Sequence, residues 1–309
     1  MRNHTRNMVF ILAGFSIHSD VQVTVFVGFL LIYIIALLAN ATVIMVIAAS
    51  TKLHTPMYCF LCVLSCLDMV LVSATVPRLL KDTWDQKKHI TFNECIVQGF
   101  VMLMLEVTDA FILTAMCYDR YIAICHPLRY TVLVSRRLCI EVVYFSCFCG
   151  FLFSFINTFL VLRLSFCEQN KIDNFLCELP AVLPLACADT LRNEIVLFAL
   201  AGSEGVVTFT IIFISYLHII RVILKIPSVE GKRKVFSTCS AHLMVVFLFF
   251  GAGACTHLTL SSSPRRQDKF VSLFYAVFLP MLNPLIYTLR NHEVKQALRE
   301  AIGMKKQYN

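Results

Sequence analysis

Residues 21–51 read VQVTVFVGFLLIYIIALLANATVIMVIAAST and include no formally charged side chain. About 20 helical residues cross the roughly 30 Å hydrocarbon core of a bilayer. The run is therefore predicted to form a membrane-spanning helix with some tilt. It is too long for the apolar region of a secretory signal peptide, so it is expected to remain as an uncleaved anchor.

The rest of the chain repeats this pattern. Hydrophobic residues make up 58% of the chain and charged residues only 15%, whereas soluble domains have about 25% charged residues. Six more apolar segments follow, at 57–80, 96–125, 138–162, 194–224, 235–260 and 270–289. The pattern predicts an all-α integral membrane protein, a seven-transmembrane helix bundle with its two termini on opposite faces of the membrane.

Basic residues indicate the cytoplasmic face, because short cytoplasmic loops are enriched in Lys and Arg. One set of loops is strongly basic and includes Lys52, Arg129, Arg136, Arg137, Arg221, Lys225, Lys232, Arg233 and Lys234. The opposite loops mix acidic and basic residues. We therefore expect an extracellular N-terminal segment (1–20), the bundle (21–289) and a cytoplasmic amphipathic helix and tail (290–309). The net charge of +8 reflects this topology, and no nucleic-acid partner is expected.

Segment 291–302 has the pattern of a short amphipathic helix. Val294, Ala297 and Leu298 recur at helical spacing among charged residues. The segment is predicted to lie along the inner membrane surface. The alternative is a solvated tail.

Cysteines and a glycosylation sequon fit an extracellular face. Four of the 14 cysteines fall in loops assigned to the outside, namely Cys95, Cys167, Cys177 and Cys187. That side is oxidising, so two disulfides are expected, and the residues alone leave three connectivities open. Zinc is the alternative, but no CxxC spacing among these four supports it. Asn3, in Asn3-His4-Thr5, is the predicted glycosylation site on the same side.

Polar residues inside the apolar segments need an explanation, because a charged group at the bilayer centre costs about 2.5–3.5 kcal/mol. Segment 96–125 contains a stripe at steps of three and four residues, formed by Met102, Glu106, Asp109, Leu113, Met116 and Arg120. These residues share one helical face, which is predicted to face the bundle interior. The stripe suggests a ligand site in the outer half and a switch at the inner end. The alternative is a helix that is polar only because it is central.

Six sequence blocks follow a family order. They are LHTPMY at 53–58, LSCLD at 64–68, MCYDRYIAICHPLRY at 116–130, SY at 215–216, KVFSTCSAHL at 234–243 and PMLNPLIY at 280–287. Over nearly the whole chain they resemble the odorant receptors of the rhodopsin-like G-protein-coupled receptor family. Phe250 and His257 depart from the family pattern, which usually has Tyr at both positions.

The resemblance implies a plasma-membrane receptor and not an enzyme. Such a receptor binds a small volatile molecule and activates a stimulatory, olfactory-type G protein to raise cAMP. A transporter is the main alternative, but internal repeats are absent and Pro284 alone suggests an interrupted helix. A chemosensory receptor outside olfaction, for a small metabolite or an amine, is a further alternative.

The resemblance also implies a G-protein switch. Its residues are Asp119, Arg120, Tyr121, Tyr216, His242, Asn283, Pro284 and Tyr287. Arg120 is expected to pair with Asp119 in the resting state, because a buried guanidinium needs a carboxylate. Pro284 removes a backbone donor, so Tyr287 is expected to rotate inward during activation. His242 either bridges the inner ends of the third and sixth spans or is only structural.

A sodium site is expected at mid-bundle. Asn40, Asp68, Asp109 and Asn283 are expected to converge there, since two close carboxylates otherwise repel or share a proton. A hydrated hydrogen-bond network is the alternative. No other cofactor is expected.

By the same resemblance, the disulfides are Cys95–Cys177 and Cys167–Cys187. The ligand site is expected in the outer half of the bundle. Its candidate residues are Met102, Glu106, Val107, Leu200, Glu204, Phe250, Ala254, His257 and Tyr275. Glu106, with Glu204, suggests a ligand that has an amine or strong hydrogen-bond donors. The alternative is that Glu106 pairs with His257 or is protonated, which leaves an apolar pocket.

Overall fold

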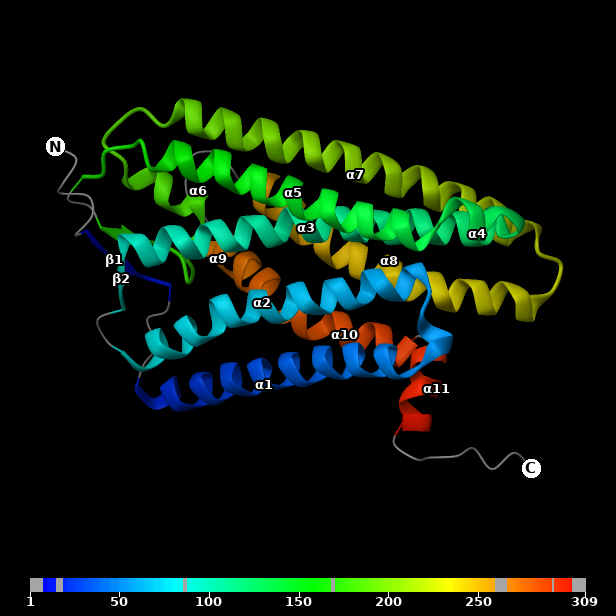
Figure 1. The fold of residues 1–309 in the computed structure, drawn as a ribbon. Coiled ribbons are helices and arrows are strands. Elements are labelled where there is room, and N and C mark those ends of the chain that lie inside the picture. The colour runs from blue at the N-terminus through cyan, green and yellow to red at the C-terminus, as the bar shows by residue number, and fades with distance from the viewer. Residues whose placement is uncertain are drawn as a thin grey trace.

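The computed structural model describes residues 8–14, 19–85, 88–167, 170–258, 266–290 and 292–301. The chain forms a bundle of long helices (Figure 1). They are α1 (Ser19–Ala49), α2 (Pro56–Trp84), α3 (Phe92–Cys125), α5 (Arg136–Val161), α7 (Leu191–Lys225), α8 (Val229–Leu258) and the continuous run α9 (Arg266–Leu273), η5 (Phe274–Phe278) and α10 (Leu279–Arg290). Six have the length and hydropathy to cross a membrane, and α8 contributes the shorter apolar stretch Cys239–Cys255. This architecture agrees with the predicted seven-helix bundle.

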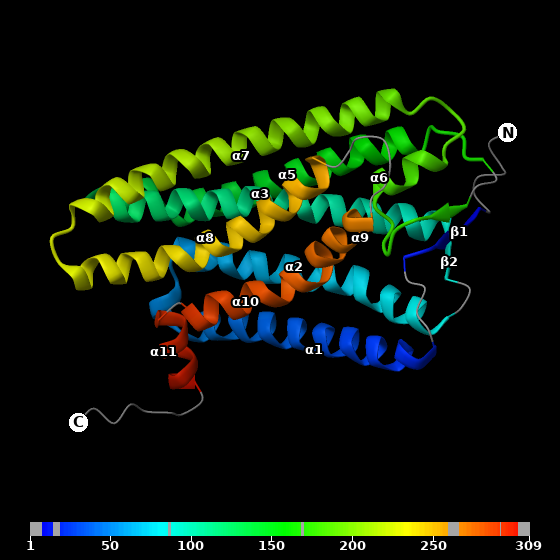
Figure 2. The same ribbon diagram turned by 180° about the vertical axis from the view of Figure 1, so that it is seen from behind.

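Short elements connect the long helices. They are η2 (Thr51–Leu53), η3 (Pro127–Arg129), α4 (Tyr130–Leu133), α6 (Leu179–Val182), η4 (Leu183–Leu185) and α11 (His292–Ala301). Figures 1 and 2 show α11 turned away from the axis of α10. Val294 on α11 is fully buried, and the Tyr58 hydroxyl donates to Glu293 at 2.6 Å. The amphipathic helix therefore docks on the bundle through its apolar face.

A small sheet covers the other end of the bundle. Its strands are β1 (Val9–Leu12), β2 (His89–Thr91) and β3 (Lys171–Ile172), in the order β2-β1-β3. Strand β1 pairs antiparallel with β2, with Phe10 opposite Ile90, and parallel with β3, with Leu12 opposite Ile172. The sequence pattern does not predict these three strands. Strands this short have no periodic pattern of their own, and their partners lie far away in the sequence. We call this end the sheet end and the opposite one the α11 end.

Local signals explain where helices begin. The Thr91 side chain accepts from the Glu94 backbone N–H at 3.3 Å, and the Glu94 carboxylate accepts from the Thr91 N–H at 3.0 Å. This capping box satisfies backbone donors that the first turn of α3 leaves free. Ser135 caps α5 by accepting from the Leu138 N–H at 3.2 Å. Strand β2 therefore passes directly into α3.

Helix α3 occupies the centre of the bundle and packs against α2, α5, α7 and α8. Its contact with α5 depends on Gly150, where an added Cβ would lie 2.3 Å from Thr108 Oγ1 and 2.4 Å from the Met104 carbonyl oxygen. Only a residue without a side chain allows the two backbones this close approach.

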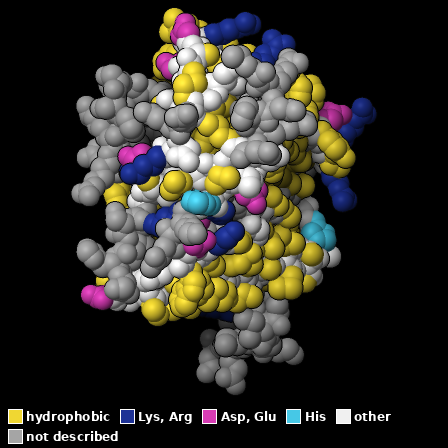
Figure 3. Space-filling view, turned by 90° about the vertical axis from the view of Figure 1, so that its left-hand side faces the viewer, with side chains coloured by type: hydrophobic (Ala, Val, Ile, Leu, Met, Phe, Trp, Pro, Cys, Tyr) yellow, Lys and Arg dark blue, Asp and Glu magenta, His cyan; other side chains and the backbone are white. Residues whose placement is uncertain are grey.

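The surface matches a lipid environment. Large hydrophobic side chains on the flanks are exposed, among them Leu38 at 63%, Phe148 at 62% and Phe247 at 74%. Figure 3 looks onto the sheet end, where acidic and basic side chains are interspersed, while hydrophobic side chains extend along the flank. A contiguous apolar flank of this extent is typical of a membrane-embedded surface.

Candidate functional site

Acidic side chains gather in the sheet-end half of the bundle. Glu106 and Asp109 lie on α3 and Glu204 lies on α7. Glu106 is close enough to Glu204 to interact with it electrostatically. Tyr275, on η5, lies within electrostatic reach of all three. Carboxyl groups from two helices that are distant in sequence therefore lie within electrostatic reach of one tyrosine on a third element.

Tyr275 lies in the π-helical turn η5, which sets the direction of its side chain. Such a turn inserts an extra residue into a helix and redirects its side chains, often at functional sites. The Tyr275 ring packs edge-on against Phe249, with 5.4 Å between centroids, and Phe249 contacts Phe250 in the same way at 5.1 Å. The Tyr275 hydroxyl is buried and has no hydrogen-bond partner among the described residues.

The other predicted ligand residues differ in their placement. Met102 and Val107 are buried, Leu200 and Phe250 are half-buried, and Ala254 is exposed. Met102 belongs to a cluster with Phe175, which lies in the segment between α5 and α7 (162–190), here called the long loop. The His257 side chain lies outside the described residues, as does Asn3.

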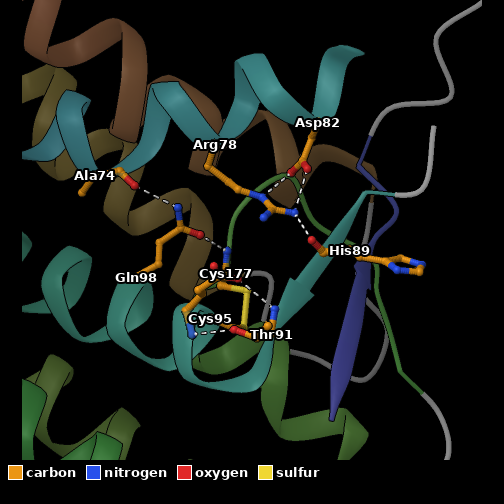
Figure 4. The surroundings of a disulfide bond; sticks show 9 residues. Ala74, Arg78, Asp82, His89, Thr91, Cys95, Gln98 and Cys177 are labelled. Atoms are coloured by element: carbon orange, nitrogen blue, oxygen red, sulfur yellow. Dashed lines mark hydrogen bonds and ion pairs between the residues drawn. A yellow bond between two sulfur atoms is a disulfide. The ribbon is translucent and has the colours of Figure 1, made fainter. Parts of the chain in front are cut away.

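The long loop closes the sheet end of the bundle. Its Cys177 is bonded to Cys95 at the start of α3, and a second disulfide joins Cys167 to Cys187. These are the pairs that the resemblance implies. Gln98 of α3 connects the long loop to α2. Its amide oxygen accepts from the Cys177 N–H at 2.9 Å, and its amide nitrogen donates to the Ala74 carbonyl on α2 at 3.0 Å (Figure 4).

A buried ion pair supports the same corner. Arg78 pairs with Asp82 at 2.8 Å, and both side chains are almost fully buried. Arg78 also donates to the His89 carbonyl at 2.7 Å, as Figure 4 shows. Arg78 thereby links α2 to the strand that precedes α3.

Glu178 is a site residue that the sequence reasoning missed. One oxygen of its carboxyl group accepts from the Ser272 hydroxyl on α9, and the other accepts from the Asn174 amide at 3.3 Å. Burial raises the pKa of Glu178, and these two hydrogen bonds act against the rise. Glu178 is also close enough to interact with Glu106. Its position next to Cys177 in the sequence could have indicated this role, because the Cys95–Cys177 disulfide holds that part of the loop against α3.

A second polar cluster lies deeper. The Asn283 amide donates to both carboxylate oxygens of Asp68, at 3.2 and 3.1 Å. The Asn40 amide donates to the Pro280 carbonyl at 3.0 Å. Because Pro284 has no N–H, the Pro280 carbonyl lacks its usual partner four residues on. Asn40 satisfies that carbonyl from another helix.

One expectation about the switch is wrong. Asp119 and Arg120, both described, form no ion pair. Adjacent residues of a helix do not face one another. Asp119 instead accepts from the Tyr130 hydroxyl on α4 at 2.8 Å, and burial together with this carboxyl group raises the pKa of the Tyr130 phenol. The MCYDRYIAICHPLRY block contains Tyr130, so a signal for this contact was present.

His242 joins three helices at the α11-end half of the bundle. It is fully buried on α8. Its Nε2 lies 3.2 Å from the Leu113 carbonyl on α3, and its Nδ1 lies 2.8 Å from the Tyr216 hydroxyl on α7. A carbonyl only accepts, so Nε2 holds the ring proton and Tyr216 donates to Nδ1.

Two other predicted switch residues have different surroundings. The Tyr121 hydroxyl lies 3.2 Å from His126 Nε2. Tyr287 is fully buried, and its hydroxyl has no partner within the described part of the chain.

Comparison with known proteins agrees with this architecture. A model of the olfactory receptor family matches residues 29–305. Olfactory receptor 2C1 of Mus musculus is 44% identical over 95% of this chain and 95% of its own length. The chain belongs to the olfactory receptor family. Olfactory receptor 2A12 of Homo sapiens is also 44% identical, over 94% of each protein.

The fold has a solved counterpart. The crystal structure of squid rhodopsin superposes with a TM-score of 0.71 at 16% identity, covering 95% of this chain and 84% of that one. This olfactory receptor is therefore a multi-pass plasma-membrane protein of the G-protein-coupled receptor class, with a small-molecule ligand and a G-protein partner. It is not an enzyme, and the transporter alternative is wrong.

Proposed function

We propose that this olfactory receptor binds a small volatile molecule in the sheet-end half of the bundle and raises cAMP through a stimulatory, olfactory-type G protein. The supporting observation is that Glu106 and Glu204 lie within electrostatic reach of each other and of Tyr275, on a bundle whose α3 is bonded to the long loop through Cys95–Cys177. A few polar groups between aromatic walls are typical of small-molecule sites. The other candidates, Met102, Val107, Leu200, Phe250, Ala254 and His257, belong to the same proposal.

The test uses cells that express the chain and record cAMP during exposure to a panel of odorants. The expected result is a concentration-dependent rise for at least one chemical class. This rise should disappear in cells that lack the stimulatory G-protein α subunit. A response that survives this deletion contradicts the stimulatory coupling.

We infer that the G-protein switch lies at the α11 end. Its residues are Asp119, Arg120, Tyr121, Tyr216, His242, Asn283, Pro284 and Tyr287. The supporting observation is the bridge that His242 makes between α3, α7 and α8. While the bridge is intact, α8 is held against α3, and outward movement of α8 would open a cleft for the G protein.

His242→Phe tests the switch, because it keeps a planar ring and removes both hydrogen bonds. We expect ligand-free cAMP to rise severalfold at equal surface expression. His54→Phe, at an exposed position, is the control and should leave it unchanged. An unaltered basal level in His242→Phe contradicts the proposed bridge.

We also infer that Asn40, Asp68, Asp109 and Asn283 hold a sodium ion. Three of them, Asn40, Asp109 and Asn283, have a buried side-chain oxygen without a hydrogen-bond partner among the described residues. Unpaired oxygens beside a carboxylate suit a hard cation, whereas a hydrated network is the alternative. Replacing choline with sodium should raise the melting temperature of the purified wild type but not of Asp68→Asn. Equal responses of the two proteins contradict the ion site.

The sheet end is proposed to be extracellular, with residues 1–20 outside, 21–289 in the membrane and 290–309 in the cytoplasm. The mixed charge of the sheet end and the two disulfides support this orientation. Antibodies against an N-terminal tag should stain intact cells, and those against a C-terminal tag should need permeabilised cells. Both tags on one side of the membrane would overturn the topology.

Asn3 is proposed to be glycosylated. A glycosidase should then change the gel mobility of the wild type but not that of Asn3→Gln.

A further inference from the structure

The carboxyl groups of the ligand site outnumber the cations near them. Glu106, Glu178 and Glu204 come from α3, the long loop and α7, and both Glu178 and Glu204 lie within electrostatic reach of Glu106. We call these three residues the acidic site. Asp109, one helical turn from Glu106 on α3, belongs to the proposed sodium site and is not counted here.

Within the described residues, no Lys or Arg forms an ion pair with the acidic site. Arg78 pairs with Asp82, Arg137 with Glu141 and Lys269 with Asp173. Gathering several carboxyl groups in a water-poor space is costly unless a cation or a proton compensates. The acidic site therefore lacks a counter-charge in the described part of the protein.

Two buried atoms indicate that a donor is missing. Glu204 Oε1 is buried and has no hydrogen-bond partner within the described ranges. The Tyr275 hydroxyl is buried and likewise unpaired there, and Tyr275 lies within electrostatic reach of Glu106 and Glu204. A ligand that supplies N–H donors would satisfy these oxygens.

We propose that the acidic site selects doubly protonated aliphatic diamines. The inference rests on the proposed ligand site and deepens it by naming the ligand class. One ammonium group with three donors would bind between Glu106 and Glu204, and the second would bind toward Glu178. The connecting methylenes are apolar and suit the wall that Phe249 and Phe250 form. A monoamine leaves part of the acidic site unpaired, and a diol brings no charge.

The test measures direct binding to purified receptor in lipid nanodiscs at neutral pH. The probes are 1,5-diaminopentane, n-pentylamine and 1,5-pentanediol, which have similar chain lengths. The diamine should bind at least tenfold more tightly than the monoamine, and the diol should bind more weakly than both. Equal or tighter binding of the diol overturns the proposal.

Substitutions test which carboxyl groups bind the diamine. Glu106→Gln and Glu204→Gln keep the side-chain volume and should each weaken diamine binding at least tenfold, with a smaller loss for the monoamine. Glu194→Gln is the matched control, because Glu194 is exposed on the same helix as Glu204 and should leave binding unchanged. Unchanged diamine affinity in both site variants, with wild-type melting temperatures, contradicts the inference.

A cAMP assay with the same probes separates the two proposals. Diamine binding that depends on Glu106 but produces no cAMP supports the acidic site and contradicts the stimulatory coupling. A cAMP response to neutral odorants that persists in Glu106→Gln, without diamine binding to the wild type, supports the coupling and rejects the diamine inference.

Discussion

Glu178 is a carboxyl group held between the long loop and the bundle. Its pKa lies above the ordinary value of 4.5, mainly because it is buried. The folded protein therefore holds the Glu178 proton more tightly than the unfolded chain does. This stabilisation is complete below the unfolded pKa and is lost as pH rises through the folded pKa.

A pH series on purified receptor checks this sign. The contribution of Glu178 to the melting temperature should decrease as pH rises above about 4.5. Glu178→Gln still accepts from Ser272 but does not titrate, so its melting temperature should lack this decrease. Glu194→Gln, at an exposed position, should follow the wild type. Identical slopes for the wild type and Glu178→Gln would show that Glu178 does not contribute.

At the level of helices, the close contact of α3 and α5 depends on one missing side chain. A Cβ at Gly150 would overlap Thr108 Oγ1 and the Met104 carbonyl oxygen. The carbonyl belongs to the α3 backbone, so a rotamer change does not relieve that overlap. The two helices would have to separate along a contact that positions Glu106 and Asp109.

Gly150→Ala is therefore expected to destabilise the receptor by about 1–3 kcal/mol, the usual cost of overpacking. Thermal unfolding in nanodiscs provides the measurement. Gly28→Ala is the control, because nothing lies within 4 Å of a Cβ there. It should be neutral or slightly stabilising, since Ala favours helix more than Gly. A wild-type melting temperature in Gly150→Ala would contradict this packing argument.

At the scale of the whole molecule, the sheet end is a single cap built from distant segments. Strand β1 pairs with the strand before α3 and with the long loop, which is bonded to α3 and contacts α9. Phe10 of β1 is fully buried, and its ring lies 6.0 Å from that of Phe92. The N-terminal strand is thus part of the core and not an appendage.

Phe10→Ala is expected to cost about 3–5 kcal/mol, the usual range for a buried phenylalanine. Less receptor should reach the cell surface, and the melting temperature should drop. Val23→Ala, at a residue 59% exposed on the flank of α1, is the control and should have little effect on either. Normal surface expression and stability of Phe10→Ala would mean that β1 is dispensable.

The sequence by itself determined the seven spans, the family and the switch motifs. Each span is a local property, because about 20 apolar residues in a row have no other stable environment than a bilayer. The three-residue and four-residue steps along α3 likewise indicated that Glu106, Asp109 and Arg120 share one face, whatever packs against it.

Only the tertiary structure decided which partners these groups meet. Asp119 accepts a hydrogen bond from Tyr130 and forms no ion pair with Arg120, Glu178 accepts from Ser272, and Asn40 satisfies the Pro280 carbonyl. Each contact joins segments whose separation and orientation depend on helix packing. The sheet follows the same rule, since strands of two to four residues are stable only when the bundle brings their partners together.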